Sequence, residues 1–529
     1  MEKAFGIDLG TTYSCIAYID EFRMPIISKN KEGHTVTPSV VYFESADNII
    51  VGQVAKDCAK LDPHKVVQAV KRHMGKSGFA YEHEGELIGP EEISSLILKK
   101  VAQDAEALLG TEVKNVVITC PAYFGISAKE ATRKAGELAG LNVLSIVDEP
   151  VAAAIAYGYT TGSDDGNKVV LVYDLGGGTF DVTMIELTEE DGKKVVNVIA
   201  TGGDNNLGGK NWDDALISHI CEEFAQEAKI DVDSLYDDAE FMQDLIKRAE
   251  DAKIGLSQRE SVKFPVIFGT HTAKLEITRE KFEEITEDLL LRTIEYTRNM
   301  LDEAAKKGYD HFHEMLMVGG STKMPQVSKA LEQEFPHVTI STYDPDEAVA
   351  KGAALFAEVV NYHIRPVPPV PPGFEDKGRI GPPKIEVKPV CSKSYGVKAV
   401  DMSDNVEKIF NLITKNTNVP ASVTNRFGTK VDNQTEALIV VLENDWNEDK
   451  VPLEYGKEIG QVALALPSGL PSNSPIEITY TITLEGILDV KGLDLTGYKD
   501  CHATIVVNDC ISEEEFKKAQ GRGLTKVVD

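Results

Sequence analysis

The chain has 529 residues and a formal net charge of −30 at pH 7, from 55 Lys and Arg against 85 Asp and Glu. This length predicts about two to four domains, and so acidic a chain argues against nucleic acid or an anionic membrane as a partner. The seven cysteines are scattered and never spaced Cys-x-x-Cys, which argues against a zinc or disulfide framework and predicts reduced thiols in a cytoplasmic protein.

The N-terminal region predicts short strands up to residue 43, the first of which ends at the sequence Asp-Leu-Gly-Thr-Thr, residues 8–12. Because a strand is predicted so close to Met1, we expect no signal peptide, and no apolar run reaches the roughly 18 residues of a membrane span. Residues 91–109 carry apolar side chains at helical spacing, and residues 116–119 predict a strand that leads to Pro121.

A glycine turn follows the apolar run 169–172 and reads Asp-Leu-Gly-Gly-Gly-Thr-Phe-Asp over residues 174–181. Three glycines let backbone amides approach a ligand closely, and a nest of amides suits phosphate oxygens. Asp174, at the strand end, can hold the water shell of a metal ion, and Thr179 offers a hydroxyl at the same edge. Taken alone, a triple glycine is more often a plain tight turn.

The pattern elsewhere in the chain favours a nucleotide cleft over a plain turn. The two Asp-Leu-Gly sequences lie 166 positions apart and predict a duplicated unit whose halves face each other. A third glycine turn, residues 317–322, ends another apolar strand, and helices are expected from about residue 211 and over residues 241–256. The common alternatives fail, because no Gly-x-Gly-x-x-Gly fingerprint opens a helix and the Gly-Lys-Ser at residues 75–77 has Val70 where a P-loop has glycine.

The composition changes after residue 362. Eight of the 23 prolines lie between Pro366 and Pro389, which predicts an extended linker over residues 363–389. Beyond it, short apolar runs separated by turn residues predict an all-β sandwich over residues 390–510. These runs cover residues 410–413, 437–442, 461–464, 476–482, 487–490 and 503–507. A short helical start over residues 513–519 is expected within the tail 511–529.

The three glycine turns, residues 7–12, 174–181 and 318–322, resemble the signatures of the 70-kDa heat-shock protein family, and the resemblance extends from about residue 3 to residue 515. It implies an α/β actin-like ATPase domain of two duplicated lobes over residues 1–362, followed by a peptide-binding sandwich. It also implies a stress-response chaperone that hydrolyses ATP to ADP with Mg²⁺, and with K⁺ as a further candidate ion. The implied partners are unfolded or extended polypeptides, J-domain proteins and nucleotide-exchange factors. We expect a short form without the family's helical lid.

The resemblance assigns site residues by position. The catalytic residues would be Lys71, Glu149, Thr179 and Asp181, and Asp8 and Asp174 would hold Mg²⁺ largely through water. The nucleotide would be bound by Gly10, Thr11, Thr12, Tyr13, Gly176, Gly177, Gly178, Gly208, Gly209, Glu250, Lys253, Ser257, Gly319, Gly320, Ser321, Lys323 and Asp346. The peptide pocket would be lined by Val397, Phe427, Ala437 and Ile439. Without the family, Lys71 is a solvated helix-side lysine, and Glu250 and Lys253 form an ordinary exposed helix pair.

The sequence departs from the family pattern around the predicted cleft. Lys210 and Asn211 follow the second glycine pair, where the family has two acidic residues, and Lys323 stands where an arginine usually stacks near the base. In the family, the proline that corresponds to Pro121 relays the nucleotide state to the peptide domain. Its usual arginine partner is Lys129 here, which keeps the charge and loses the planar fork.

Two other classes of function stay open. One is a small-molecule kinase of the same actin-like fold, for example a sugar or acetate kinase, against which the predicted sandwich argues. The other is a non-enzymatic scaffold or a nucleotide-dependent filament.

The linker predicts weak communication between the two domains. The family has a short leucine-rich linker that docks on the ATPase domain, whereas residues 361–365 are followed here by prolines, which lack the N–H groups needed to add a strand to a lobe. We therefore expect saturating peptide to stimulate ATP hydrolysis by less than about threefold. The alternative is that Ile364 and Val367 dock and give ordinary coupling.

Overall fold

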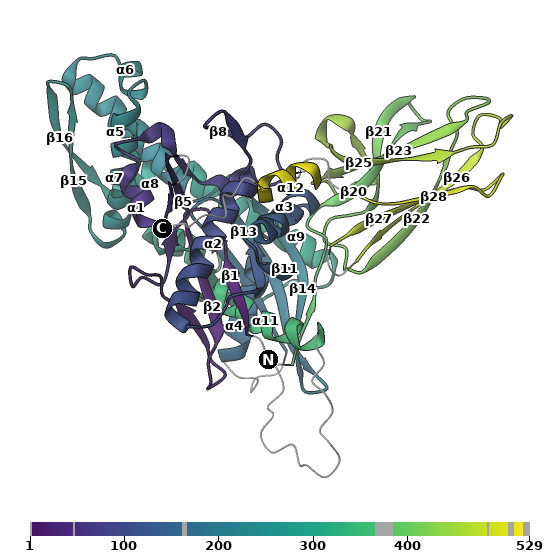
Figure 1. The fold of residues 1–529 in the computed structure, drawn as a ribbon, viewed down its shortest axis with the longest axis horizontal. Coiled ribbons are helices and arrows are strands. Elements are labelled where there is room, and N and C mark those ends of the chain that lie inside the picture. Colours follow the sequence, from purple (N-terminus) through teal and green to yellow (C-terminus); the bar gives the residue numbers. More distant parts are fainter. Residues whose placement is uncertain are drawn as a thin grey trace, which may run out of the picture.

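The computed structural model describes residues 3–45, 48–160, 167–364, 384–483, 486–505, 511 and 513–521. Figure 1 shows an α/β part with a β-sandwich beside it. The α/β part contains two six-stranded sheets, and the sandwich contains a five-stranded and a four-stranded sheet. Within the described ranges, no helix is both long enough and apolar enough to cross a membrane.

The two sheets of the α/β part share one strand plan. The first has the order β11-β10-β1-β2-β3, with β4 beside β2, and the second has the order β18-β17-β12-β13-β14-β19. In each sheet three strands form an antiparallel meander, and two later strands extend it in parallel from its first strand. The duplication predicted from the repeated Asp-Leu-Gly sequence is therefore confirmed.

The strands of the first sheet are β1 (Ala4–Asp8), β2 (Tyr13–Ile19), β3 (Pro25–Ser28), β4 (Thr37–Pro38), β10 (Asn115–Cys120) and β11 (Asn142–Asp148). Those of the second are β12 (Lys168–Leu175), β13 (Phe180–Glu190), β14 (Lys193–Asp204), β17 (Glu314–Val318), β18 (Thr339–Thr342) and β19 (Ile385–Lys388).

Strands β1 and β12 place the two aspartates at matching points of the two lobes. Residues 169–175 of β12 are all buried, as expected for a central strand with both faces covered. Strand β1 runs parallel to β10, and β12 runs parallel to β17. Asp8 is the last residue of β1, and Asp174 is the last but one of β12. The Asp-Leu-Gly loops therefore leave corresponding edges of the two sheets.

Two helices, α4 (Glu149–Thr160) and α11 (Ala348–Ile364), pack against each other within a core that also contains side chains from both sheets. Their contact depends on small residues, since a Cβ at Gly352 would lie 1.7 Å from Ala152 O. This shared core fixes the position of one lobe relative to the other near the two aspartates.

The other elements of the α/β part surround this core and form the outer parts of both lobes. The helices are α1 (Gln53–Cys58), α2 (Pro90–Leu109), α3 (Ile126–Leu138), α5 (Gly209–Ala228), α6 (Asp233–Tyr236), α7 (Ala239–Gln258), α8 (Arg279–Ile285), α9 (Glu287–Lys306) and α10 (Pro325–Glu334), with short 3₁₀ turns at Pro63–Lys65, Val70–His73 and Gly320–Lys323. The strands are β5 (Val40–Ser45), β6 (Asn48–Val51), β7 (Val66–Gln68), β8 (Tyr81–His83), β9 (Glu86–Ile88), β15 (Ser261–Phe268) and β16 (His271–Thr278).

The predicted sandwich consists of two antiparallel sheets with the orders β24-β21-β20-β23-β25 and β22-β26-β27-β28. Their strands are β20 (Ser394–Asp401), β21 (Val406–Ile413), β22 (Ala421–Gly428), β23 (Glu436–Asn444), β24 (Lys450–Pro452), β25 (Lys457–Ala465), β26 (Pro475–Ile482), β27 (Leu488–Asp494) and β28 (Asp500–Thr504). The short helix α12 (Glu513–Gly521) follows and lies near α3 of the first lobe. Lys134 Nζ of α3 donates to Ile511 O at 2.6 Å.

The linker contributes a strand to the second six-stranded sheet, so the expectation that it adds none is wrong. Strand β19 pairs in parallel with β14, with Ile385 opposite Lys194 and Lys388 opposite Asn197. Most of the prolines lie in residues 365–383, outside the described residues, and β19 begins after them, where each residue has an N–H group to donate. The side chains of Ile364 and Val367, the alternative docking residues, also lie outside the described residues.

The sandwich contacts the loop between β10 and α3 of the first lobe. Tyr123 Oη donates to Asp445 Oδ1 at 2.6 Å, and Lys393 Nζ lies 2.5 Å from the same carboxylate oxygen. The ammonium groups of Lys393 and Lys415 lie 3.6 and 4.5 Å from the Tyr123 ring centroid, at cation–π distance. Burial lowers the pKa of Lys415 to about 8.

The next residues of the same loop are also bound by the sandwich. Ser392 Oγ donates to Phe124 O at 2.8 Å, and Ile126 N donates to Glu443 Oε2 at 3.2 Å. Gly125 leaves room for this carboxylate, because a Cβ there would lie 2.1 Å from Glu443 Oε2. A buried carboxylate of the sandwich therefore caps the N-terminus of α3 in the first lobe.

Candidate functional site

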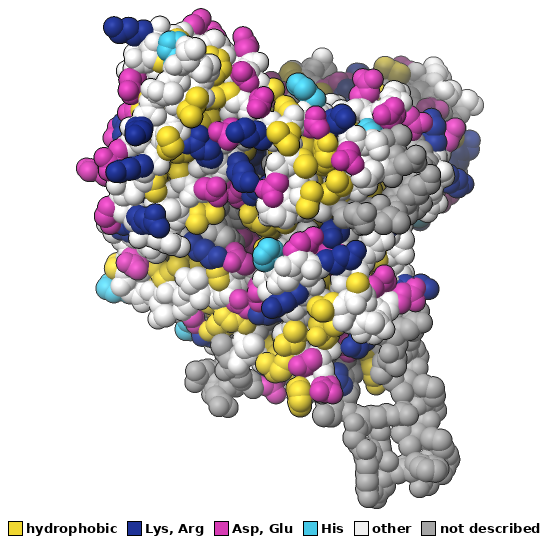
Figure 2. Space-filling model, turned by 60° about the vertical axis from the view of Figure 1, so that its left-hand side comes forward, with side chains coloured by type: hydrophobic (Ala, Val, Ile, Leu, Met, Phe, Trp, Pro, Cys, Tyr) yellow, Lys and Arg dark blue, Asp and Glu magenta, His cyan; other side chains and the backbone are white. Residues whose placement is uncertain are grey.

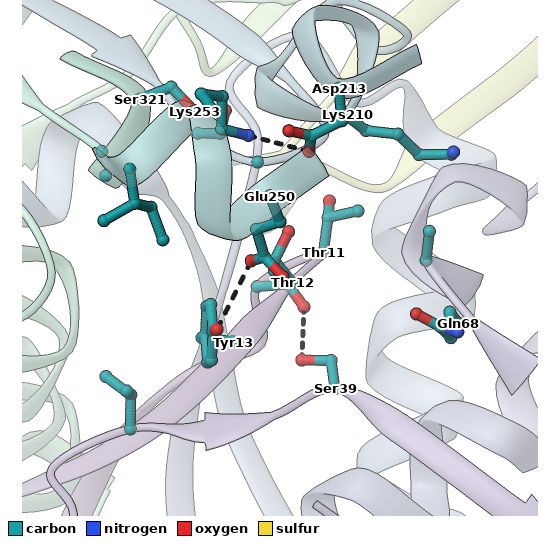
Figure 3. Close-up of a pocket in the computed structure, with 18 of the residues that line it drawn as sticks. Thr11, Thr12, Tyr13, Ser39, Gln68, Lys210, Asp213, Glu250, Lys253 and Ser321 are labelled. Carbon is teal, nitrogen blue, oxygen red and sulfur yellow. Dashed lines mark hydrogen bonds and ion pairs between the residues drawn. The ribbon is translucent and has the colours of Figure 1, made fainter. Parts of the chain in front are cut away.

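A cavity of about 1010 Å³ lies between the two lobes and is lined by residues from both. Figure 2 shows lysine and arginine side chains beside carboxylates on the face that contains a hollow between the lobes. Figure 3 shows residues of the cavity wall from the first Asp-Leu-Gly loop, from α7 and from the start of α5, together with Ser39, Gln68 and Ser321 from other segments.

The two Asp-Leu-Gly loops face each other directly. A Cβ on Gly177 would lie 2.0 Å from Thr12 Oγ1, and one on Gly178 would lie 2.3 Å from Thr11 Cγ2. Any side chain at these two positions would collide with the opposite loop, so glycine is required for this approach. Where the two loops meet, the second loop therefore carries no side chains at these two positions and leaves its backbone bare. A backbone cradle for phosphate oxygens requires such bare backbone.

Four carboxylates gather beside these loops and Lys71: Glu149, Asp174 and Asp181 are buried, and Asp8 is half-buried. Lys71, in the 3₁₀ turn Val70–His73, forms an ion pair with Glu149, the first residue of α4; their side chains are 4% and 9% exposed. Burial raises the pKa of Glu149 to about 7, although the Lys71 charge opposes the shift. Burial raises the pKa of Asp8 as well, and burial with repulsion from Glu149 and Asp181 raises that of Asp174 well above its ordinary value.

Among the described residues, no three acidic, histidine or cysteine side chains are arranged to ligate a metal ion directly, so these carboxylates fit a cation that is held largely through water. If all four carboxylates were ionised and Lys71 were protonated, the net charge of the cluster would be 1 − 4 = −3. Mutual repulsion is among the causes of the raised pKa of Asp174, and a divalent cation would relieve it. Asp8, Glu149 and Asp174 also line the cavity, and Thr119 Oγ1 donates to Asp8 Oδ1 at 2.8 Å, which orients that carboxylate.

Asp181 lies behind the cavity wall, in β13 directly opposite Asp174. It is 1% exposed, and burial raises the pKa of its carboxyl group well above the ordinary value. Tyr123 N donates to Asp181 Oδ1 at 3.0 Å. Tyr123 therefore contacts the sandwich through its side chain and Asp181 through its backbone.

One end of the cavity carries polar side chains from α7 and α5. Lys253 Nζ donates to Gly209 O at 3.1 Å and to Asp213 Oδ2 at 2.8 Å, and Ser257 Oγ donates to Lys253 O at 3.2 Å. Glu250 lies in the same helix and receives Lys56 Nζ at 2.5 Å.

The third glycine turn is tied to the second loop. Gly319 has φ of 84°, and a Cβ there would lie 2.4 Å from Leu175 O, so both its conformation and its surroundings favour glycine. Ser321 Oγ donates to Gly176 O at 2.9 Å. Lys323 Nζ lies 2.5 Å from Asp346 Oδ2 at the mouth of the cavity.

Three glycine turns around one cavity are the arrangement predicted from the resemblance, and the comparison with known families agrees with it. A model of the family described as Hsp70 protein matches residues 4–523 of the chain. This chain belongs to the Hsp70 family. It is a chaperone of the Hsp70 type, with the family's actin-like α/β part followed by its β-sandwich.

Most residues that the Hsp70 resemblance assigned to nucleotide, metal and catalysis line this one cavity. The four that do not are Asp181, Gly178, Gly208 and Gly209. Gly209 N donates to Gly176 O at 3.0 Å, and a Cβ on Gly208 would lie 2.6 Å from Gly178, so these glycines shape the second loop from behind. The role of each residue toward a nucleotide stays a prediction.

Three of the cavity-wall residues that were not predicted from the sequence make contacts with predicted site residues. Ser39 Oγ donates to Gly10 O at 2.8 Å and so braces the first loop, while Lys56 and Asp213 contact Glu250 and Lys253. Ser39 and Lys56 reach the site through tertiary folding alone and carry no local signal. Asp213 does have one, since it follows the second glycine pair near the start of a predicted helix.

The four predicted peptide-pocket residues of this Hsp70 chain lie together in the sandwich. Val397 and Ile439 are 2% exposed and belong to its core, and Phe427 and Ala437 are half-buried and pack against that core. The Phe427 ring contacts Phe410 at a centroid distance of 5.9 Å. Contact of these residues with a peptide stays a prediction.

Ion pairs connect the two lobes across the mouth of the cavity. Each joins the α1 region to α7: Lys56 with Glu250 at 2.5 Å, Lys60 with Asp244 at 3.0 Å, and Asp57 with Lys247 at 2.7 Å. The side chains of Lys56 and Glu250 are 14% and 17% exposed, whereas the other pairs are more exposed and more screened by salt. We call these three pairs the clasp, and we predict that it must open before a nucleotide leaves the cavity.

We expect Lys56→Ala to accelerate ADP release by about tenfold, because it removes the least exposed pair of the clasp. Lys60→Ala, which removes a more exposed pair, should accelerate release by less than about threefold. Stopped-flow release of a fluorescent ADP analogue at low and high salt measures both effects. Release that is unchanged in both variants and independent of salt would show that the clasp does not limit the opening of the cleft.

Proposed function

We propose that this chain is an ATP-driven chaperone, in which the cleft hydrolyses ATP to ADP and phosphate and the sandwich binds extended apolar segments of unfolded proteins. The observation that supports it most is the direct apposition of the two Asp-Leu-Gly loops beside Lys71 and the buried carboxylates. This arrangement offers a backbone cradle, a cation and acidic groups within one cavity, which phosphoryl transfer needs.

The residues divide the reaction between binding and chemistry. The backbone of residues 10–12 and 176–178 binds the β- and γ-phosphates, and the polar groups of α7 bind the nucleoside. Lys71 stabilises negative charge on the transferring phosphoryl group. Glu149 and Thr179 orient the attacking water. Asp8 and Asp174 would hold Mg²⁺ largely through water, and the ion, when bound, neutralises charge on the phosphates; K⁺ is a further candidate ion at the same cluster.

Asp181 connects hydrolysis to the sandwich in this proposal. The Asp181 carboxylate helps to position the attacking water together with Glu149 and Thr179. The position of this carboxylate depends in turn on the hydrogen bond from Tyr123 N. Tyr123 in turn binds Asp445 of the sandwich. A peptide that changes the position of the sandwich would thereby change the geometry of the hydrolysis site. J-domain and nucleotide-exchange proteins would act on the same equilibrium between the docked and the displaced sandwich.

The proposed peptide site predicts fast exchange. Ala437 stands where a larger aliphatic residue is usual in the family, so the pocket lacks roughly two methyl groups at about 0.8 kcal/mol each. A bound apolar peptide should therefore leave within seconds, and Ala437→Val should lengthen its lifetime by about tenfold. Leu438→Ala, on the opposite face of the strand, is the control. A fluorescent peptide that stays bound to the parent protein for minutes after a chase would contradict this prediction.

Phosphate release from ATP, with and without Mg²⁺, tests the proposed activity directly. We expect turnover with Mg²⁺ and its loss on addition of EDTA, with no phosphorylated small molecule formed when sugars or acetate are present. Phosphate transfer to one of these acceptors would identify a kinase instead.

A further inference from the structure

Ser39 holds the first Asp-Leu-Gly loop by two hydrogen bonds. It lines the cavity next to the end of β4 and is 2% exposed. Its Oγ donates to Gly10 O at 2.8 Å, and its backbone N donates to Thr12 O at 2.9 Å. Ser14 Oγ lies 2.9 Å from Ser39 Oγ and is the donor of that pair, because the hydroxyl proton of Ser39 is already used for Gly10 O. Figure 3 shows Ser39 beside the loop residues Thr11 and Thr12.

The bond to Gly10 O fixes the direction of the next amide. In a planar trans peptide group the C=O and the N–H point in opposite directions. Gly10 O is bound to Ser39, so the Thr11 N–H points away from Ser39. Thr11 lines the cavity, and its N–H has no protein acceptor in the part of the chain that the structure describes. A free amide donor is therefore held in one direction before a ligand arrives.

The second Asp-Leu-Gly loop repeats this arrangement. Gly176 is the counterpart of Gly10, since each follows Asp-Leu in the sequence. Gly176 O accepts from Ser321 Oγ at 2.9 Å, as Gly10 O accepts from Ser39 Oγ. Gly209 N also donates to Gly176 O, at 3.0 Å, whereas Gly10 O has no second donor among the described residues. A serine hydroxyl therefore holds the same carbonyl in both lobes, and in the first lobe it does so alone.

The first loop needs such a bond because of its glycine. A Cβ at Gly10 would lie 2.0 Å from Tyr13 O, so no other residue fits. Glycine allows more backbone conformations than any other residue, so a glycine loop loses more entropy when a ligand orders it. A hydrogen bond that orders the loop beforehand removes part of this cost and so raises affinity.

We propose that Ser39 is a positioning residue that turns the Thr11 amide toward the phosphates of a bound nucleotide and so raises the affinity of the cleft for them. This inference rests on the proposed nucleotide-binding function and adds a residue to it. Ser39 acts through the peptide group of Gly10 and Thr11, so its loss should weaken the binding of ligands that carry phosphates and spare a nucleoside.

Titration with ADP, a non-hydrolysable ATP analogue and adenosine tests this role without any need for turnover. We expect Ser39→Ala to bind at least one of the two phosphorylated ligands about tenfold more weakly than the parent, and adenosine within about threefold of it. Ser39→Thr keeps the hydroxyl group and should bind all three ligands as the parent does. Ser95→Ala is the matched control, because Ser95 is also a buried serine of the first lobe and its Oγ donates to Glu92 O in its own helix.

The outcomes separate this inference from the proposed function. A parent protein that binds neither phosphorylated ligand would contradict the proposed function itself. If the parent binds them and Ser39→Ala binds them equally well, or loses adenosine as strongly, only the role of Ser39 is overturned. If melting shows that Ser39→Ala does not fold, the amide signal of Thr11 in the parent, labelled with isotope-enriched threonine, replaces the variant. We expect this signal to move when a phosphorylated ligand binds, and a signal that moves with neither would overturn the inference.

Discussion

Lys71→Ala should nearly abolish ATP hydrolysis while it changes ATP affinity by no more than a few-fold. Ground-state binding comes from the backbone of the two loops and from the polar residues of α7, which the substitution leaves intact. The lysine acts on charge that develops in the transition state, so its loss lowers the rate far more than the affinity. Single-turnover hydrolysis and nucleotide titration on the same preparation measure the two quantities separately.

The control for this variant is Lys65→Ala, an exposed lysine whose ammonium donates to Glu44 O outside the cavity. Lys71→Ala also leaves Glu149 without its counter-charge, which a melting curve would reveal as lost stability. Hydrolysis by Lys71→Ala within about threefold of the parent rate would show that Lys71 does not stabilise the transition state.

Asp445→Ala should uncouple the sandwich from the ATPase site. This carboxylate holds Tyr123 Oη and the 8% exposed Lys393, and without it two lysines at the contact lose their nearest negative charge. Because the sandwich is docked in the structure, we now expect saturating peptide to change the single-turnover hydrolysis rate of the parent by about tenfold, equal to a coupling of about 1.4 kcal/mol. In Asp445→Ala this change should fall below about threefold.

Small-angle scattering shows whether the loss of coupling accompanies separation of the domains. We expect a larger radius of gyration for Asp445→Ala and the parent value for Glu454→Ala, which removes an exposed carboxylate of the same sandwich. If Asp445→Ala separates the domains and peptide still changes hydrolysis by about tenfold, the signal does not travel through Tyr123.

The fold and the Asp-Leu-Gly loops of the site could be predicted because the sequence signals for both are local. Asp8 and Asp174 each lie at the end of an apolar run and are followed by Leu-Gly, and the repetition of this pattern indicates a duplicated unit. Residues 91–109 carry helical spacing throughout, and α2 is observed at Pro90–Leu109. In these segments the local preference and the tertiary environment favour the same structure.

The contacts between domains could not be predicted, because they depend on surfaces that only the folded chain brings together. Strand β19 is four residues long and follows a run of prolines, and it forms because the edge of β14 is free to receive it. Tyr123 and Asp445 are 322 positions apart, and nothing in either local sequence indicates the pairing. The expectation of weak coupling was based on the prolines of the linker and left β19 out.

Single-turnover ATP hydrolysis by the intact protein, with an apolar heptapeptide or a Gly/Ser heptapeptide at saturation, is the most direct test of the account. An ATP-driven chaperone with a docked sandwich should hydrolyse ATP to ADP and phosphate, and its rate should change by about tenfold with the apolar peptide and remain unchanged with the Gly/Ser peptide. Absence of hydrolysis, or one and the same rate with both peptides, would contradict it.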